Sequence, residues 1–267
     1  MASRSAIWQR RTPARAWCIW LAWLLGMTVV YYCLTLIADH TEWFFVADAP
    51  GVAADIASRM VPPAWETLPT LMRPLWDTFN IATLGTLLAV VMALPVAFLA
   101  AANTTPSLML VRPLALLIIV SSRSINSLIW GLLLVTILGP GVLAGVLAIA
   151  LRSVGFMAKL LYEAIEEIDH RPVEALESTG ASTLQVLNFG IWPQILPAFF
   201  GILVFRWDIN IRESTILGLV GAGGIGLALQ SAINVVAWQQ VAVILLLILL
   251  TVLLSEWVSA RVRHAII

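Results

Sequence analysis

Long apolar runs alternate with short polar segments along this chain, and their lengths match membrane-spanning helices. The runs cover residues 17–37, 78–101, 142–161, 195–220 and 235–258. A helix needs about 20 apolar residues to cross the hydrocarbon core of a bilayer. The pattern therefore predicts a transmembrane helix over each run.

A further apolar stretch, residues 111–138, is interrupted by the polar sequence SSRSINS at 121–127. The stretch is too long for one upright span. We expect a segment along the membrane interface and then a span that begins near Ser124; a single tilted helix is the alternative. With this span, the sequence predicts an all-α membrane protein with six transmembrane helices.

Composition agrees with a membrane protein. Charged residues make up 11% of the chain and hydrophobic residues 61%, with a mean hydropathy of +0.96, whereas a soluble domain carries about 25% charged residues. The formal net charge is zero, and nothing in it indicates a nucleic-acid partner. Cys18 and Cys33 fall in one predicted helix and lie too far apart to form a disulfide.

The distribution of arginines predicts the orientation in the membrane. Residues 39–77 hold six acidic residues and only two arginines, which is typical of an outer loop, because Lys and Arg concentrate in cytoplasmic segments. Both termini are then expected in the cytoplasm. We divide the chain into residues 1–77 (tail, first span and periplasmic loop) and a core of five spans, 78–267. The inner segments hold Arg4, Arg10, Arg11, Arg15, Arg112, Arg171, Arg261 and Arg263.

The polar segment 163–197 separates the fourth and fifth predicted spans. Pro172 suits the first turn of a helix, and Gly180 suits its end. Ser182 is then a candidate N-cap of a second helix, and Pro193 and Pro197 are expected to interrupt the chain after this helix. The pattern predicts two short helices with a break between them, a surface that a membrane protein offers to a soluble partner.

At these residues the chain resembles the EAA loop of the permeases of ATP-binding-cassette (ABC) importers. The resemblance rests on Glu174, Ala175, Gly180 with Ala181, and Pro193. This chain has Leu176 where the family has a second Ala, Gly190 where it has Ile, and Trp192 where it has Leu. The sequences RSINSLIWGLLLVTILGPGVLAG (123–145) and FRWDINIRESTILGLVGAGGIG (205–226) resemble the phosphonate and phosphite branch of that family.

The resemblance covers roughly residue 78 to the C-terminus and carries several implications. It implies a type I ABC-importer permease fold with cytoplasmic coupling helices, in a bacterial inner membrane. It implies a second permease copy, two ATPase subunits and a periplasmic binding protein as partners, with phosphonate, phosphite or a related phosphorus oxyanion as substrate. It implies neither a cofactor nor catalysis by this chain.

Charged residues within the fifth predicted span are the main candidates for a translocation pathway. A charge at the centre of a bilayer costs about 2.5–3.5 kcal/mol, so these residues must face protein or water. Residues 208 and 212 are spaced to pair on one helix face, and a structural ion network is the alternative to a pathway. The candidates are Arg206, Asp208, Asn210, Arg212 and Glu213.

The segment around Arg123 and Asn126 is a second pathway candidate, placed beside the pore by the resemblance; a hydrogen-bonded kink is the alternative. Arg123, Arg152, Arg206 and Arg212 outnumber the intramembrane acids Asp208 and Glu213. A surplus of positive charge lowers the barrier for an anion. For Arg152 the alternative is that its side chain reaches the inner interface.

The sequence GAGGIG at 221–226 matches a dinucleotide-binding pattern, but an apolar span precedes it where a strand would be required. We interpret Gly221, Gly223, Gly224 and Gly226 as a tight turn that forms part of an outer gate. The sequence contains no P-loop motif, so if transport is driven by ATP, a separate subunit must hydrolyse it. The acidic residues near 163–169 are interpreted as a solvated face and not as a metal site.

Two other functions compete with that of an ABC permease. An ion- or proton-coupled transporter would use Asp208 and Glu213 as a relay, but such folds often show internal repeats, and none is evident here. An intramembrane enzyme is disfavoured because His40, His170 and His264 all lie outside the predicted spans.

Overall fold

The computed structural model describes residues 13–266, with side chains described for residues 17–264. Arg4, Arg10 and Arg11 lie outside the described residues, as does the side chain of Arg15. The described part of the chain forms helices and no strands. It divides into two units, Met1–Ala57 and Ser58–Ile267, which are described separately.

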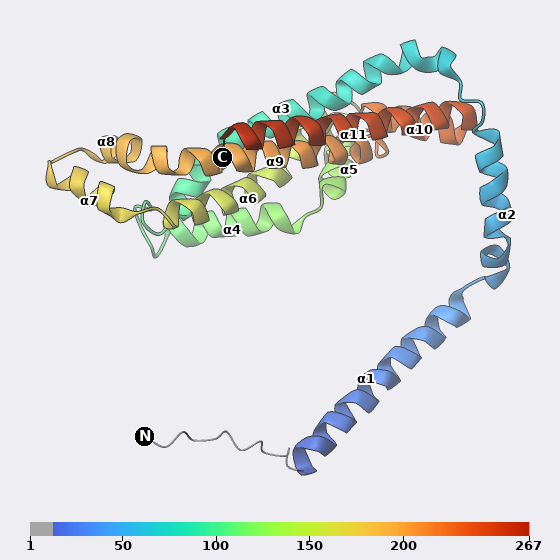
Figure 1. Ribbon diagram of the computed structural model, residues 1–267, viewed down its shortest axis with the longest axis horizontal. Coiled ribbons are helices and arrows are strands. Elements are labelled where there is room, and N and C mark those ends of the chain that lie inside the picture. The colour runs from blue at the N-terminus through green and yellow to red at the C-terminus, as the bar shows by residue number, and fades with distance from the viewer. Residues whose placement is uncertain (1–12, 267) are drawn as a thin grey trace. The chain divides into compact units, whose positions relative to one another are not determined.

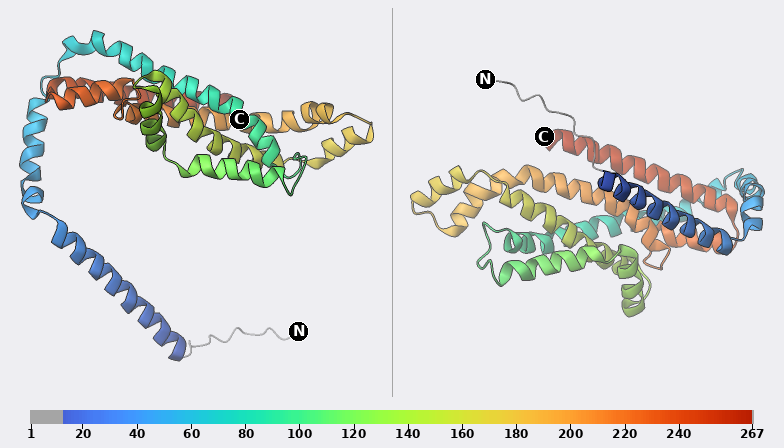
Figure 2. Two further views of the ribbon diagram at one scale, coloured as in Figure 1. Left: turned by 180° about the vertical axis from the view of Figure 1, so that it is seen from behind. Right: turned by 90° about the horizontal axis from the view of Figure 1, so that it is seen from below.

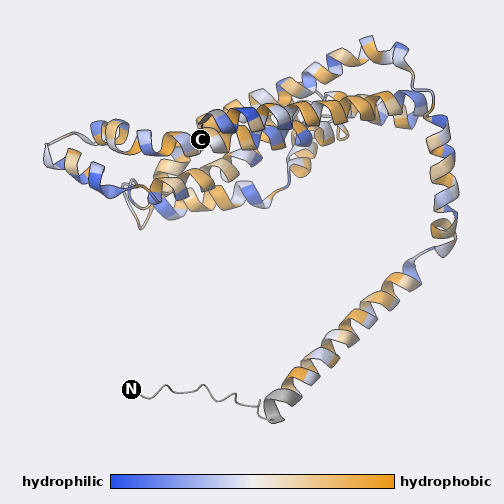
Figure 3. Cartoon of the chain, in the orientation of Figure 1, coloured by the Kyte–Doolittle hydropathy of each residue, from blue (hydrophilic) through white to orange (hydrophobic). Residues whose placement is uncertain are grey.

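The first unit consists of helix α1 (Pro13–His40) and most of helix α2 (Trp43–Arg59). The candidate span Trp17–His40 agrees with the predicted run 17–37, and none of it is buried. Figure 3 shows hydrophobic residues on successive turns of α1. A helix that is apolar all round requires an apolar environment, as inside a bilayer.

The second unit is a bundle of long helices that run side by side (Figures 1 and 2). Its elements in chain order are η1 (Trp65–Thr67), α3 (Leu68–Ala100), α4 (Val111–Ser124), α5 (Ser127–Leu138), α6 (Val142–Glu166), α7 (His170–Ser178), α8 (Thr183–Gln185), a π-helical turn η2 (Val186–Ile191), α9 (Trp192–Gly218), α10 (Ile225–Asn234) and α11 (Trp238–Ile266). Helix α6 packs against α3, α4, α5 and α9, and α9 packs against α11.

Five described helices are long and apolar enough to cross a membrane, and the bent pair α4–α5 makes a sixth if it counts as one span. The two helices of this pair meet at 88°. Residues Ile125 and Asn126 at the bend are extended, which confirms the predicted break at 121–127. With 12 residues, α5 rises only about 18 Å and does not cross the hydrocarbon core by itself.

The start of the second predicted span differs from the prediction. Helix α3 begins at Leu68 and not at Thr78, so the division expected after residue 77 falls inside this helix. Leu71 is buried in a cluster with Ile225 and Ile244. Residues that are distant in sequence thus pack against the first turns of α3. The helix therefore includes residues 68–77, whose charges and prolines are typical of a loop.

The segment 221–234, between the fifth and sixth predicted spans, contains the helix α10, which packs against α9 and α11. Its first turn approaches α9 very closely: a Cβ atom on Gly226 would lie 1.9 Å from the carbonyl oxygen of Thr215. The Ile225 N–H donates to Thr78 Oγ1 at 2.7 Å, which fastens the start of α10 to α3. Glycine at position 226 is therefore a packing requirement.

Candidate functional site

The polar residues of α9 point to two different neighbours. Asp208 accepts a hydrogen bond from Arg212 at 2.7 Å, which confirms the predicted pairing four residues apart. Asp208 also accepts from Ser255 of α11 at 2.8 Å. Arg206, Asn210 and Glu213 lie on another face, toward α3 and α6.

A buried network joins Arg206 and Asn210 to the neighbouring helices. Arg206 is 2% exposed, and its Nε donates to Ser153 Oγ of α6 at 2.9 Å. Ser153 donates to Asn210 Oδ1 at 3.1 Å, and Asn210 Nδ2 donates to Thr86 Oγ1 of α3 at 2.8 Å. Arg206 NH2 lies 3.4 Å from Glu213. Three long helices are thus tied together by side chains that cannot bond to lipid.

Sequence reasoning did not include Ser153 and Thr86 in this network. Both are fully buried hydroxyls within apolar helices, and they supply the partners that the buried Arg206 and Asn210 require. A hydroxyl inside a predicted span was the available signal, but many such residues bond only to their own helix.

Arg152 extends the network to the bend between α4 and α5. Its NH1 donates to Asn126 Oδ1 at 3.1 Å and to Ser127 Oγ at 3.3 Å. Its Nε lies 3.6 Å from Glu213 Oε1. Arg152 lies near the middle of α6, and these contacts hold its guanidinium against α5 and α9. Asn126 also caps α5 by accepting from the Leu128 N–H.

The pathway candidates thus differ in exposure within this chain. Arg206, Asp208 and Asn210 are buried, and the Glu213 side chain is 14% exposed. Arg212 is 44% exposed, although it is paired with Asp208. Arg123, in the last turn of α4, is exposed.

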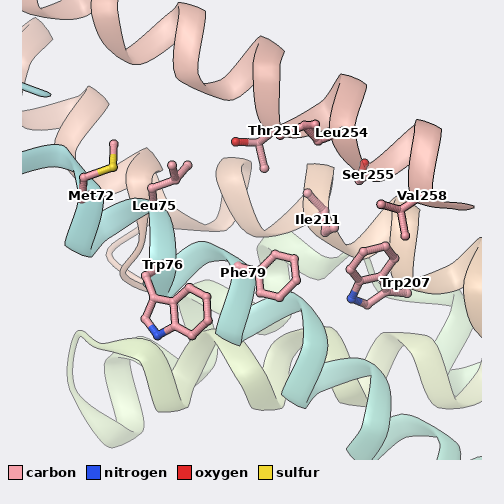
Figure 4. Close-up of a pocket in the computed structure, with 10 residues that line it drawn as sticks. All are labelled: Met72, Leu75, Trp76, Phe79, Trp207, Ile211, Thr251, Leu254, Ser255 and Val258. Carbon is pink, nitrogen blue, oxygen red and sulfur yellow. The ribbon is translucent and has the colours of Figure 1, made fainter. Parts of the chain in front are cut away.

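An apolar groove of about 580 Å³ lies between α3, α9 and α11 (Figure 4). Its lining is almost entirely hydrocarbon and aromatic. The two hydroxyls in it already have partners, since Thr251 donates to Leu247 O and Ser255 to Asp208. The groove offers no charge to an anion. Its lining residues are Met72, Leu75, Trp76, Phe79, Trp207, Ile211, Thr251, Leu254, Ser255 and Val258.

The predicted helix–Gly–helix element is present between α6 and α9. Helix α7 has Asp169 as N-cap, and Gly180 follows it with φ of +77°. Ser182 and Gln185 form a capping box at the start of α8. Pro193 and Pro197 do not interrupt the chain as expected: α8, η2 and α9 continue into one another, because the π-helical turn absorbs the change before Pro193.

Gln194 braces this element against the start of α9. Its amide accepts from the Asp169 N–H at 3.0 Å and donates to the carbonyls of Asp169 and Gly190.

Hydrogen bonds from the side chain and backbone of Arg171 hold the pKa of the Asp169 carboxyl below its usual range. The cap is therefore ionised at neutral pH, and its stabilising contribution is lost only as the pH falls through that lowered pKa.

Two of the departures from the EAA pattern face each other. A Cβ atom on Gly190 would lie 3.1 Å from Leu176 Cδ1 and 3.4 Å from Val173 Cγ2. The larger side chain at 176 thus occupies the space that a side chain at 190 would take. The packing of α7 on η2 is retained by exchanging volume between these two positions.

Gly221, Gly223 and Gly224 lie in a tight turn, as expected, whereas Gly226 belongs to the first turn of α10. Gly221, Gly223 and Gly224 have positive φ. Gly221 O accepts from the Gly141 N–H at 3.1 Å, so this turn is joined to the turn between α5 and α6. The geometry is that of two packed turns at one end of the bundle.

Comparisons with known proteins agree with this architecture. The sequence profile of the binding-protein-dependent transport system inner membrane component family matches residues 93–266. The phosphite transport system permease protein PtxC of Stutzerimonas stutzeri is 42% identical over 90% of this chain and 88% of its own length. The phosphate-import permease protein PhnE of Mycolicibacterium smegmatis is 38% identical over 79% of this chain and 40% of its own length.

Solved structures show the same fold. A chain of the inward-facing MetNI methionine ABC transporter aligns with a TM-score of 0.65 and 21% identity, covering 76% of this chain and 98% of its own. A bacterial ABC transporter for alginate aligns with a TM-score of 0.57 and 18% identity, over 92% of this chain and 99% of its own.

The fold is therefore that of a type I ABC-importer permease, a multi-pass protein of the inner membrane. This chain belongs to the binding-protein-dependent transport system inner membrane component family.

Replacing Ser153 by Ala tests the buried network. The change leaves Arg206 Nε and Asn210 Oδ1 without their partner, so we expect a loss of about 1–3 kcal/mol in the free energy of unfolding. Unfolding of the purified protein in detergent measures the loss. The matched control is Ser231→Ala, since Ser231 is exposed and bonds to its own helix; equal stability of the two variants would contradict the role of Ser153.

A double-mutant cycle tests the exchange of volume between Leu176 and Gly190. Leu176→Ala leaves a void and Gly190→Ile overpacks, so each alone is expected to destabilise α7 by about 1–2 kcal/mol. The double variant is expected to recover most of this loss. Amide hydrogen exchange over 170–178 reports the local stability, with the exposed Leu184→Ala as control. Strictly additive losses would show that the two positions do not compensate.

Proposed function

We propose that this chain is the membrane-spanning subunit of an ATP-driven importer for phosphite, phosphonate or a related phosphorus oxyanion. The observation that carries the substrate class is the 42% identity to a phosphite permease along nearly the whole chain. The phosphate-import relative and a cryptic phosphonate permease of Escherichia coli, 39% identical over 44% of this chain, support the same class.

The charges of the bundle suit an anionic substrate. In the network of α6 and α9, two guanidinium groups, Arg152 and Arg206, share one carboxylate, Glu213. The Arg212–Asp208 pair is balanced. A local surplus of positive charge along a pathway favours passage of an anion.

The alternative of a proton-coupled carrier finds less support in these contacts. Asp208 and Glu213, the two carboxylates available as a relay, are each held by arginine. A relay group must exchange its proton with a chain of acceptors, whereas each of these carboxylates is engaged by guanidinium groups.

The proposed assembly contains two permease copies, two ATPase subunits in the cytoplasm and a periplasmic binding protein, with both permease termini in the cytoplasm. Residues Glu174, Ala175, Gly180, Ala181 and Pro193 belong to the coupling element that the ATPase contacts. ATP-driven closure would move α7 and α8 as a rigid body and switch access across the membrane. The turn at 221–226 would serve as part of the outer gate.

Two exposed apolar side chains on the coupling element suit contact with a soluble partner. Leu184 is 73% exposed and Phe189 71%, on a segment whose neighbours are polar. The buried core of a protein interface is apolar and enriched in aromatic residues. Sequence reasoning did not single out these two residues.

We therefore expect Leu184→Glu to reduce ATPase copurification by about tenfold or more, because the carboxylate would be buried in an apolar contact. The permease itself should keep its stability, since Leu184 supports no buried contact. Leu108→Glu, at a 60%-exposed residue in the preceding inner loop, is the control. Unchanged copurification of the Leu184 variant would remove this residue from the interface.

The substrate proposal is tested by uptake into proteoliposomes that contain the complete complex and its binding protein. We expect phosphite or phosphonate accumulation that requires ATP and persists when an uncoupler collapses the proton gradient. Accumulation that stops with the uncoupler while ATP is present would favour a coupled carrier. Accumulation of another substrate class would refute the phosphorus oxyanion.

A further inference from the structure

The bend between α4 and α5 places polar side chains where a straight span would have hydrocarbon. The two helices are joined by extended residues at 88°. Asn126 and Ser127 follow the bend, and Arg152 of α6 reaches both of them. This cluster lies beside α6 near its midpoint, and its contacts come from segments 25 and 26 residues apart in sequence.

The guanidinium of Arg152 is only partly engaged by the protein. NH1 carries the hydrogen bonds to Asn126 and Ser127, and Nε faces Glu213 at 3.6 Å. Among residues 17–264, no acceptor is assigned to NH2, and the side chain is 30% exposed. An arginine has five N–H donors, and the two on NH2 have no acceptor in the described part of the chain.

The charge balance around Arg152 is positive. Glu213 lies between Arg206 and Arg152, at 3.4 Å and 3.6 Å, so one carboxylate serves two guanidinium groups. Arg206 is buried and committed to Ser153, whereas Arg152 is accessible. A positive charge inside a membrane that is only partly balanced by a carboxylate costs free energy. Such charged side chains face the bundle interior or a water-filled cavity and mark the pathway of an ion.

We propose that Arg152 is a direct contact of the substrate anion during translocation, and that Asn126, Ser127 and Glu213 position it. This inference rests on the proposed function. The free NH2 can donate a charge-assisted hydrogen bond to an oxygen of a tetrahedral phosphorus oxyanion. Glu213 keeps the cluster from holding the anion too tightly, because conduction requires release as well as binding.

Arg123 is a separate contributor to the same positive region. It lies in the last turn of α4, three residues before Asn126, and its side chain is exposed. Because no carboxylate pairs with it among the described residues, it adds to the attraction of an anion without fixing its orientation. We expect its removal to have a smaller effect than removal of Arg152.

The test uses the complete complex in proteoliposomes with saturating binding protein, so that affinity for the binding protein does not limit uptake. Arg152→Gln is expected to lower phosphite uptake about tenfold or more while binding-protein-stimulated ATP hydrolysis is retained. The number of anions moved per ATP therefore falls. A merely structural arginine would lower uptake and hydrolysis together, and that result would overturn the proposal.

Two further variants make the outcome decisive. Arg152→Lys keeps the charge for Glu213, but an ammonium lacks the planar guanidinium that can contact Asn126, Glu213 and an anion at once. We expect about a threefold or greater loss of anions per ATP, and a ratio equal to that of the unmodified complex overturns the proposal. This variant carries the test if Arg152→Gln does not assemble. Arg261→Gln, an exposed arginine stacked on Trp257, is the matched control and should change neither rate.

The same assay separates failure of this inference from failure of the proposed function. If the unmodified complex moves no phosphorus oxyanion, the function is refuted before Arg152 is examined. If the unmodified complex moves phosphite and the Arg152 variants move it equally well per ATP, only the role of Arg152 is refuted.

Discussion

The bundle depends on the requirement that every polar group inside a membrane finds a partner within the protein. Arg206 satisfies this requirement through Ser153 and Glu213, and Asn210 through Ser153 and Thr86. Lipid supplies no hydrogen bonds, so these contacts hold α3, α6 and α9 in one register as well as stabilising them. The register of α9 against α6 in turn places Glu213 beside Arg152 and thereby sets the charge at the bend of α4 and α5.

The permease has two regions with different physical character. Within the bundle, close packing at glycine and alanine and the buried network resist rearrangement. At the coupling element, α7 has no buried residue and is joined to the bundle through Gln194 and through the contact of Leu176 with Gly190. An exposed, locally capped element on a rigid bundle suits the transmission of a partner's movement, because it can be gripped without opening the core.

The likeness to methionine and alginate transporters shows that this bundle is shared by proteins with unrelated cargo. Substrate choice must then arise from side chains and not from the fold. The bend is the part of this chain where accessible polar side chains and incompletely balanced charge coincide. The apolar groove between α3, α9 and α11 is larger, but it has no charge with which to select an anion.

Features that depend on neighbouring residues could be predicted from the sequence. These include the apolar spans, the break near 121–127, the end of α7 at Gly180, the cap at Ser182 and the Asp208–Arg212 pair. Each is decided within a few residues by length, backbone freedom or helical spacing.

Only the tertiary structure decided which distant groups meet. Ser153 and Thr86 became partners of Arg206 and Asn210, Leu176 filled the space beside Gly190, and packing of Leu71 on α10 and α11 set where α3 begins. These contacts join residues well separated along the chain, and no local preference encodes them. They follow from the way the helices pack and from the cost of leaving a buried polar group or a void unfilled.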